Sequence, residues 1–245
     1  MKHILIIGAN SSIATATARR WALEGHRFYL LGRTEATLRS LAADLTVRGA
    51  SKVSIGMFEA DAFTGHSSLL DAAITELGGL DLVLIAHGSL PDQKRCERDF
   101  SYALAELNVN AISTLSFLTH LANRLESQRR GALVVLSSVA GDRGRESNYL
   151  YGTAKAAVTV FLQGLRQRLA KSGVTVLTVK PGFVDTPMTA HLKKGPLWAS
   201  PETIARCIDQ GLARGRHESY SPGFWRLIMW IIRSIPSRIF SKLSL

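Results

Sequence analysis

Three side chains in the middle of the chain have the types and the spacing that proton transfer requires. Tyr151 and Lys155 are four residues apart, so on a helix both lie on one face. Ser138 follows an apolar run that is typical of a strand. A tyrosine with an ordinary pKa of about 10 is a poor catalyst near neutral pH, but a nearby ammonium stabilises the phenolate and lowers that pKa. Since a serine hydroxyl can orient a carbonyl oxygen, the trio predicts chemistry on a carbonyl or an alcohol.

The elements that must position these side chains alternate between apolar runs and helical patterns. The expected strands are 3–7, 27–31, 52–57, 81–86, 132–137 and 174–180, and the expected helices are 12–24, 34–46, 66–77, 98–126 and 152–171. Nearly continuous apolar strands indicate a parallel sheet that helices bury on both faces. We therefore expect an α/β fold with one doubly wound parallel sheet of about seven strands, a Rossmann fold. Ser138 would then lie at the carboxyl end of a strand, where such sheets bind ligands.

The turn after the first strand has the features of a phosphate-binding loop. Residues 8–14 have the sequence GANSSIA, between an apolar strand and a helical pattern. Glycine permits the tight turn, short polar side chains can bond phosphate, and the amides at the helix start favour an anion. The residues expected to line the phosphates are Gly8, Asn10, Ser11, Ser12 and Ile13. Of the glycines usual in such loops only Gly8 is present, and Ser12 and Ala14 occupy the positions of two others.

The end of the second strand indicates which dinucleotide is bound. NAD-binding versions of the fold place an acidic residue there, on the 2′-hydroxyl of the adenosine ribose. This chain has Arg33 instead, and a guanidinium suits a 2′-phosphate. The position favours NADP(H) over NAD(H). The alternative interpretation is a solvated surface arginine at the start of a helix.

Composition limits the partners and the domain organisation. The 245 residues are 46% hydrophobic and 20% charged, which suits one globular catalytic domain over 1–220 with a lid near 183–200. The net charge is +11, but no basic stripe interleaved with aromatics occurs, so we expect no nucleic-acid partner. Cys96 and Cys207 lie far apart without metal-ligand spacing, which favours a reducing compartment and no metal site. A first strand beginning at residue 3 leaves no room for a signal peptide, and we expect a cytoplasmic protein.

The segment 221–245 is basic and amphipathic. It contains arginines and a lysine but no acid, and its apolar residues recur at helical spacing until Pro236. The run is shorter than the ~20 residues that span a bilayer. We predict a helix within 222–245 that contacts the inner face of a membrane. The alternative is a helix buried in a subunit contact or over the substrate pocket. Both interpretations rest on the apolar and basic residues of the segment, which are Phe224, Trp225, Arg226, Ile228, Trp230, Ile231, Arg233, Ile235, Arg238, Ile239 and Lys242.

Taken together, the motifs resemble the short-chain dehydrogenase/reductase family over roughly residues 1–190. The positions that match in order and spacing are Gly8, Asp61, Gly88, Asn110, Ser138, Tyr151, Lys155 and Pro181-Gly182. The resemblance implies that Tyr151 is the general acid in carbonyl reduction and that Lys155 binds the nicotinamide ribose. It implies that Ser138 holds the substrate oxygen and that Asn110 positions a water in a proton relay.

The same resemblance implies the remaining cofactor contacts. Asp61 would contact the adenine, Gly88 the ribose region and Thr186 the nicotinamide carboxamide. The expected set is completed by Ala86, Tyr151, Lys155, Pro181, Gly182 and Val184. The segment Ile85-Ala86-His87-Gly88 departs from the family's Asn-Asn-Ala-Gly, and we interpret His87 as a structural histidine beside the cofactor. The family also implies a homodimer or a homotetramer.

A narrower resemblance concerns the substrate. The segment SSVAGDRGRESNYLYG, the altered glycine loop and the apolar-basic tail are similar to those of reductases of polyprenylphosphoryl 2-keto-pentofuranoses. That resemblance implies a lipid-linked keto-sugar, decaprenylphosphoryl-erythro-pentofuranosid-2-ulose being the example. One alternative is a ketoreductase of long-chain acyl or steroid-like ketones. A second is a non-catalytic NADP(H) sensor, but sensors of this fold typically lack the tyrosine–lysine pair that this chain has.

Overall fold

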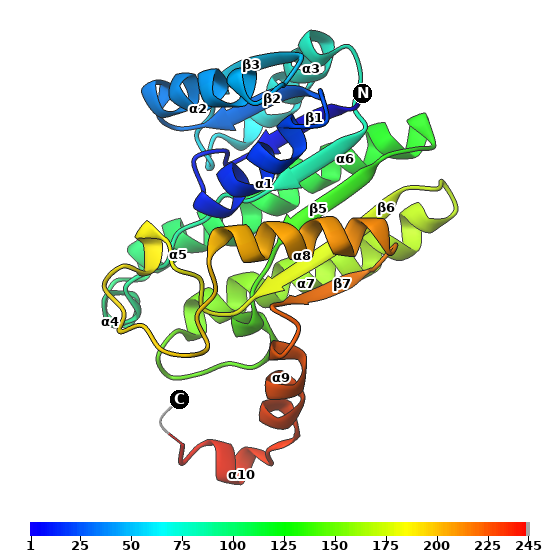
Figure 1. Ribbon diagram of the computed structural model, residues 1–245. Coiled ribbons are helices and arrows are strands. Elements are labelled where there is room, and N and C mark those ends of the chain that lie inside the picture. The colour runs from blue at the N-terminus through cyan, green and yellow to red at the C-terminus, as the bar shows by residue number, and fades with distance from the viewer. Residues whose placement is uncertain (244–245) are drawn as a thin grey trace.

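Seven parallel strands form a single sheet in the order β3-β2-β1-β4-β5-β6-β7 in the computed structural model, which describes residues 1–243 (Figure 1). The bounds are β1 His3–Ile7, β2 Arg27–Gly32, β3 Lys52–Met57, β4 Leu82–Ile85, β5 Ala132–Leu136, β6 Thr175–Pro181 and β7 Glu218–Ser221. The order runs outward in both directions from β1 and β4, so the switch point lies between these two strands. Ligands of doubly wound sheets bind beyond the carboxyl ends at that point. The predicted Rossmann architecture is confirmed.

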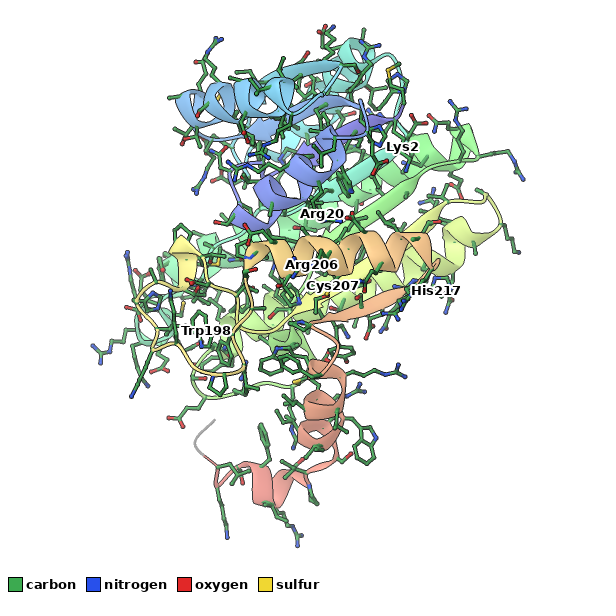
Figure 2. All side chains as sticks on the ribbon, in the orientation of Figure 1. Lys2, Arg20, Trp198, Arg206, Cys207 and His217 are labelled. Atoms are coloured by element: carbon green, nitrogen blue, oxygen red, sulfur yellow. The ribbon has the colours of Figure 1, made fainter. Side chains whose placement is uncertain are left out.

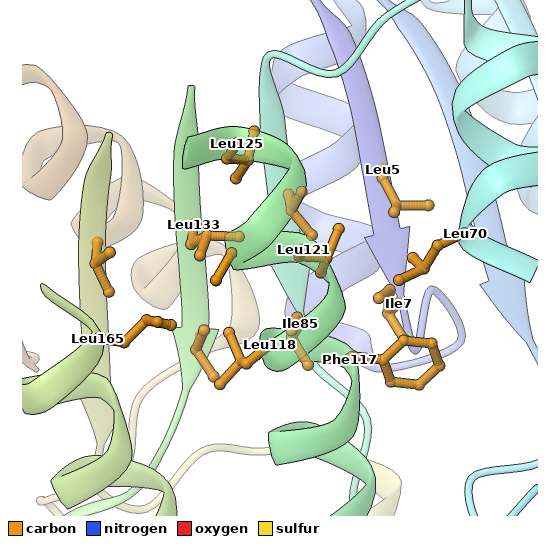
Figure 3. Packing of buried hydrophobic residues seen from close by; sticks show 14 of the residues in the cluster. Leu5, Ile7, Leu70, Ile85, Phe117, Leu118, Leu121, Leu125, Leu133 and Leu165 are labelled. Atoms are coloured by element: carbon orange, nitrogen blue, oxygen red, sulfur yellow. The ribbon is translucent and has the colours of Figure 1, made fainter. Parts of the chain in front are cut away.

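Helices cover both faces of the sheet (Figure 1). One face packs against α1 Ser12–Ala22, α2 Glu35–Val47 and α8 Pro201–Ala213, and the other against α3 His66–Leu77, α6 Ser113–Gln128 and α7 Tyr149–Ala170. Alternate residues of each strand enter opposite cores. Leu5 and Ile7 pack with Phe117 of α6 (Figure 3), whereas Ile4 and Ile6 pack on the α1 side. Burial on both faces explains why the central strands β1, β4 and β5 are almost entirely apolar.

Asp209 joins α8 to α1, the middle helix of the first face. Its carboxylate accepts hydrogen bonds from Arg20 Nε at 2.5 Å and from Trp21 Nε1 at 2.8 Å. Figure 2 labels Arg20, which lies on α1 next to α8. Helix α8 has a well-formed start, because Pro201 is its first residue and the Ser200 hydroxyl accepts from the Thr203 amide. These contacts hold α1, and with it the turn that precedes it, against the sheet.

Two elements differ from the sequence expectation. The helix expected over 98–126 is divided into α5 Phe100–Leu107, a π-helical turn Asn108–Ile112 and α6, after a short α4 Gln93–Cys96. Hydrophobic spacing does not reveal a π turn, because the apolar stripe continues through it. The seventh strand, β7, has only four residues, ESYS, and lacks the apolar run by which the other strands were recognised.

The chain after β6 forms a loop and two short helices. The loop contains a 3₁₀ turn, η4 Pro187–Thr189, and Val184 pairs with Ala199 across its base. The tail forms α9 Trp225–Ser234 and α10 Ser237–Phe240, which lie beyond the carboxyl ends of β6 and β7 (Figure 1). Pro236 separates the two helices, as expected. Over residues 1–243 the structure has no helix with the length and apolarity needed to cross a membrane.

Candidate active site

Ser138 is positioned by a close approach between the segment after β5 and α7. It caps η3, the 3₁₀ turn Val139–Asp142, and its hydroxyl accepts from the Ala140 amide at 3.1 Å. Gly152 of α7 permits the approach, since a Cβ atom there would lie 2.9 Å from the Ala140 carbonyl oxygen. The result is that the Ser138 side chain lies beside the Tyr151 phenol, one turn along α7 from Lys155.

Burial dominates the acidity of the tyrosine. It raises the pKa of Tyr151 from 10 to about 12, and hydrogen bonding with the Ser138 side chain lowers the pKa only in part. Lys155 Nζ lies 5.6 Å from the centroid of the phenol ring. Desolvation of the phenolate is therefore the larger effect on this pKa, and the structure does not show the net lowering below 10 that the sequence led us to expect. At neutral pH the phenol keeps its proton, which is the form that can protonate a carbonyl oxygen.

Lys155 is a buried cation, 4% exposed. Its Nζ donates to the Leu136 carbonyl oxygen at 3.1 Å, the sole hydrogen bond of this ammonium to another residue within 1–243. Burial lowers the pKa of Lys155 from 10.5 to about 8. An ammonium has three donors, so two remain for ligands. A Cβ atom on Gly88 would lie 3.6 Å from Nζ, which places the end of β4 next to this charge.

Asn110 is held rigidly in the π turn, 1% exposed. Its Nδ2 donates to Ser89 Oγ at 2.8 Å and to the Glu106 carbonyl oxygen at 3.0 Å, and its Oδ1 accepts from the Ser89 amide at 2.9 Å. Ser89 Oγ in turn donates to the Glu106 carboxylate. A Cβ on Gly88 would lie 2.8 Å from Asn110 Oδ1, so only glycine fits here. The structure thus brings together Asn110, Gly88 and Lys155.

Glu106 was not predicted from the sequence. It lies four residues before Asn110, and its carboxylate accepts from both Ser89 and Asn110. This spacing, an acid one helical turn before a candidate relay residue, is the signal that could have identified it. Glu106 therefore acts on the site through the orientation of Asn110.

The turn between β1 and α1 comes very close to the backbone after β4. Gly8 has φ of +85°, and a Cβ there would lie only 2.4 Å from the His87 backbone nitrogen. The Ser11 side chain makes no capping bond, and neither the Ser11 nor the Ser12 hydroxyl bonds another residue within 1–243. The first turn of α1, Ile13 included, has no acid. A helix start with free donors and no negative charge suits a phosphate.

His87 is a structural residue, as interpreted from the sequence. Its Nε2 lies 2.9 Å from Ser113 Oγ, and its ring packs edge-on against Phe58 and Phe117. Burial, with a smaller effect of the Lys155 charge, lowers the pKa of His87 to about 3. The imidazole therefore stays neutral at physiological pH and supports the backbone under Gly8.

The residues expected at the adenosine end follow the carboxyl ends of neighbouring strands. Arg33, after β2, is exposed and makes no ion pair with any residue of 1–243. A Cβ on Gly32 would lie 3.0 Å from Asn10 Oδ1, so the Asn10 side chain reaches this strand end. Asp61 is exposed in the loop after β3, and Ala86 follows β4, where its amide donates to the Ile7 carbonyl oxygen at 2.8 Å.

The segment after β6 is covered by aromatic side chains. Pro181 ends β6, and Gly182 lies under Trp225 of α9, because a Cβ on Gly182 would lie 1.9 Å from Trp225 Nε1. Phe183 stacks on Trp198 at 5.5 Å and meets Trp225 edge-on at 5.6 Å (Figure 2 labels Trp198). Of the other expected residues, Val184 is buried, and Thr186 caps η4 with Thr189. Sequence spacing did not identify Trp225 and Trp198 as neighbours of this segment.

Comparison with known proteins agrees with this geometry. The family model described as short chain dehydrogenase matches residues 2–196. An uncharacterized oxidoreductase of Mycobacterium tuberculosis is 35% identical over 240 residues, 98% of this chain and 96% of that protein. The uncharacterized oxidoreductase in the mprA 5′ region of Streptomyces coelicolor is 34% identical over 243 residues, 99% of this chain and 96% of the relative.

The fold and the site define a dinucleotide-dependent oxidoreductase built on one doubly wound sheet. The chain belongs to the short-chain dehydrogenase/reductase family, whose members use nicotinamide cofactors. The residues present fit such a cofactor, since a glycine turn with positive φ, two unbonded serine hydroxyls and a buried ammonium with free donors lie at the carboxyl edge of the sheet.

Proposed function

We propose that this protein is an NADP(H)-dependent oxidoreductase that transfers hydride between the nicotinamide and a carbonyl or secondary alcohol. The observation that carries the proposal is the joint placement of Ser138, Tyr151, Lys155 and Asn110 at the carboxyl edge of the sheet. A sensor would not need a protonated phenol beside a buried ammonium. Lys155 costs stability where it lies, and such a cost is typical of a catalytic position.

Each side chain has one task in this proposal. When bound, the cofactor supplies or accepts the hydride. The Tyr151 phenol donates its proton to the substrate oxygen during reduction, and Ser138 holds that oxygen by a hydrogen bond. Lys155 binds the ribose hydroxyls with its free donors and stabilises the negative charge that develops on the phenol oxygen. Asn110, held by Ser89 and Glu106, orients the path by which Tyr151 regains a proton.

NADP(H) is favoured over NAD(H) because of Arg33. This guanidinium has no acidic partner among the described residues, so it is free to bind a 2′-phosphate. We expect NADPH to bind more tightly than NADH by at least tenfold, since one charge-assisted pair contributes about 1.5–3 kcal/mol. Binding is measured through the emission of the reduced nicotinamide. Arg33→Asp should narrow or reverse the preference.

Arg98→Asp is the matched control for that experiment. Arg98 is also exposed and lies after α4, away from the adenosine end, so this variant makes the same charge change without touching the proposed contact. Equal affinity of the starting protein for NADPH and NADH, or an equal effect of both substitutions, would contradict the assignment to Arg33.

The proposed substrate is hydrophobic or lipid-linked, and a polyprenylphosphoryl 2-keto-pentofuranose is our first candidate. Support comes from the aromatic side chains of Phe183, Trp198 and Trp225, which gather after β6, where we expect the nicotinamide to bind. Stacked aromatic rings suit both an apolar chain and the apolar face of a sugar ring. A long-chain acyl or steroid-like ketone is the second candidate, favoured by the same apolar surroundings.

A comparison of kcat/KM distinguishes these candidates. The panel consists of a polyprenylphosphoryl keto-sugar, the same keto-sugar phosphate without its lipid, a long-chain acyl ketone and a steroid ketone, each with NADPH. The first candidate requires the lipid-linked sugar to be reduced most efficiently, with a loss when either the lipid or the sugar is removed. Preference for the steroid or acyl ketone would replace it with the second candidate.

A further inference from the structure

Helix α9 has two apolar faces, and only one of them packs on the protein. The inner face buries Trp225 and Met229, 3% and 4% exposed, against Val139. The outer face leaves Leu227, Trp230 and Ile231 at 61%, 68% and 51% exposure, although side chains of this kind favour burial. Ile239 of α10, 56% exposed, is a further apolar residue of the tail. Because the inner face is already covered, the outer face needs a different explanation.

The tail is fixed in this orientation by Arg143. Its guanidinium donates to the carbonyl oxygens of Ile232 at 2.6 Å and Ile235 at 2.7 Å, at the carboxyl end of α9. The same guanidinium stacks on the Phe240 ring at 3.8 Å. These contacts satisfy the last carbonyls of α9 and complement its dipole. The outer face therefore cannot turn inward without losing them.

Positive charge accompanies the exposed apolar residues. Arg226, Arg233, Arg238 and Lys242 are exposed, and none makes an ion pair within the part of the chain that the structure describes. The described residues after 218 include no acid. A groove of about 770 Å³ runs beside α9, lined by Arg226, Trp230 and Arg233. The acid at its border, Glu218, is already paired with Lys180 Nζ at 2.9 Å.

We propose that α9 and α10 dock the protein on an anionic lipid surface. Leu227, Trp230 and Ile231 enter the boundary between headgroups and acyl chains, and the arginines bind lipid phosphates. A second copy of the chain fits this face less well, because an isologous contact would bring like charges together without acids to pair them. This inference rests on the tail alone and does not depend on the proposed function.

The docked orientation has a consequence for the site. The inner face of α9 contacts Gly182 through Trp225, and Gly182 follows the strand that ends at the nicotinamide side. One helix thus contacts the lipid with its outer face and the catalytic domain with its inner face. The surface that binds the membrane and the site are therefore joined by a single rigid element.

Co-sedimentation of the full chain with vesicles tests the proposal. We expect binding to phosphatidylcholine vesicles that contain phosphatidylglycerol and little binding to phosphatidylcholine alone. The variant R226Q/R233Q/R238Q should lower the partition coefficient by on the order of 100-fold, since each basic residue near such a surface contributes about fivefold. The variant R130Q/R214Q/R216Q is the matched control, because these three exposed arginines also lack ion pairs within 1–243. They lie before β5 and β7, at the amino ends of the strands, whereas the tail lies beyond the carboxyl ends.

Two further readouts separate docking from other roles of the tail. Trp230 is the most exposed of the four tryptophans, so anionic vesicles should shift the emission to shorter wavelength, and Trp230→Phe should remove the shift while binding largely persists. The proposal is overturned by equal binding to both vesicle types, or by equal losses in the two triple variants. It is also overturned if L227S/W230S abolishes a dimer in analytical ultracentrifugation and no vesicle binding occurs. Neither experiment requires turnover, so failure of the proposed reaction would leave this result intact.

Discussion

Replacement of Lys155 by methionine should make the protein more stable and abolish its activity. Lys155 is a buried cation, 4% exposed, and its hydrogen-bond acceptor within 1–243 is a carbonyl oxygen rather than a carboxylate. Burial lowers its pKa from 10.5 to about 8. A methionine of similar length fills the same space without a charge. The variant therefore isolates the free-energy cost of keeping an ammonium at this position.

The size of the effect follows from the pKa difference. A shift of one pKa unit corresponds to about 1.4 kcal/mol, so the buried charge costs about 3 kcal/mol at pH 7. The lost hydrogen bond to Leu136 O offsets about 1 kcal/mol of the gain. The net stabilisation of about 2 kcal/mol corresponds to a rise in Tm of about 4–8 °C for a chain of this size.

The pH dependence of the same variant provides a stricter test. The folded-state pKa lies below the unfolded one, so between about pH 8 and 10.5 the unfolded chain binds more protons. The stability of the starting protein therefore rises with pH in that window, relative to the variant. At about pH 9.5 the two proteins should have nearly equal free energies of unfolding in urea. The reasoning would be refuted if the variant were less stable than the starting protein at pH 7. It would also be refuted if the difference between their free energies of unfolding did not change with pH.

Three other predictions concern the surroundings of the site. Gly182→Ala should displace Trp225, cost about 1–3 kcal/mol of stability and change tryptophan emission, because the new Cβ would lie 1.9 Å from the indole nitrogen. Glu106→Gln should lower kcat by about tenfold or more without changing NADPH affinity, because it disturbs only the partners of Asn110. An unchanged kcat would show that Glu106 does not position Asn110 for the reaction. The rate of carbonyl reduction should fall as pH rises through about 8, where Lys155 loses its charge. A rate that rises through this range would contradict that role.

The sequence was sufficient to predict the fold because burial on both faces leaves a clear pattern. Six strands have apolar runs, and all six occur in the structure. The seventh strand escaped prediction because its four residues are mostly polar and only pairing with β6 reveals it. The π turn at Asn108–Ile112 escaped because its apolar spacing matches that of an ordinary helix.

The site could be predicted only where motifs define the residues. The positions of Ser138, Tyr151 and Lys155 followed from their spacing, but the raised pKa of Tyr151 depends on packing that spacing does not show. The contact of Trp225 with Gly182 joins residues distant in the chain, and no local pattern predicts it. The faces of the tail also could not be predicted. Its apolar residues divide between a buried and an exposed face of α9, and helical spacing alone does not show which residues pack on the protein.

The most direct test of the central claim is a paired measurement on Tyr151→Phe. NADPH affinity is measured by nicotinamide emission, and turnover by the loss of reduced nicotinamide absorbance with the best ketone of the substrate panel. Loss of the phenol proton should lower kcat by at least about a hundredfold. NADPH affinity should stay within about threefold, because the hydroxyl contributes at most a weak bond to the cofactor. A variant that retains full turnover would contradict the assignment of Tyr151 as the proton donor.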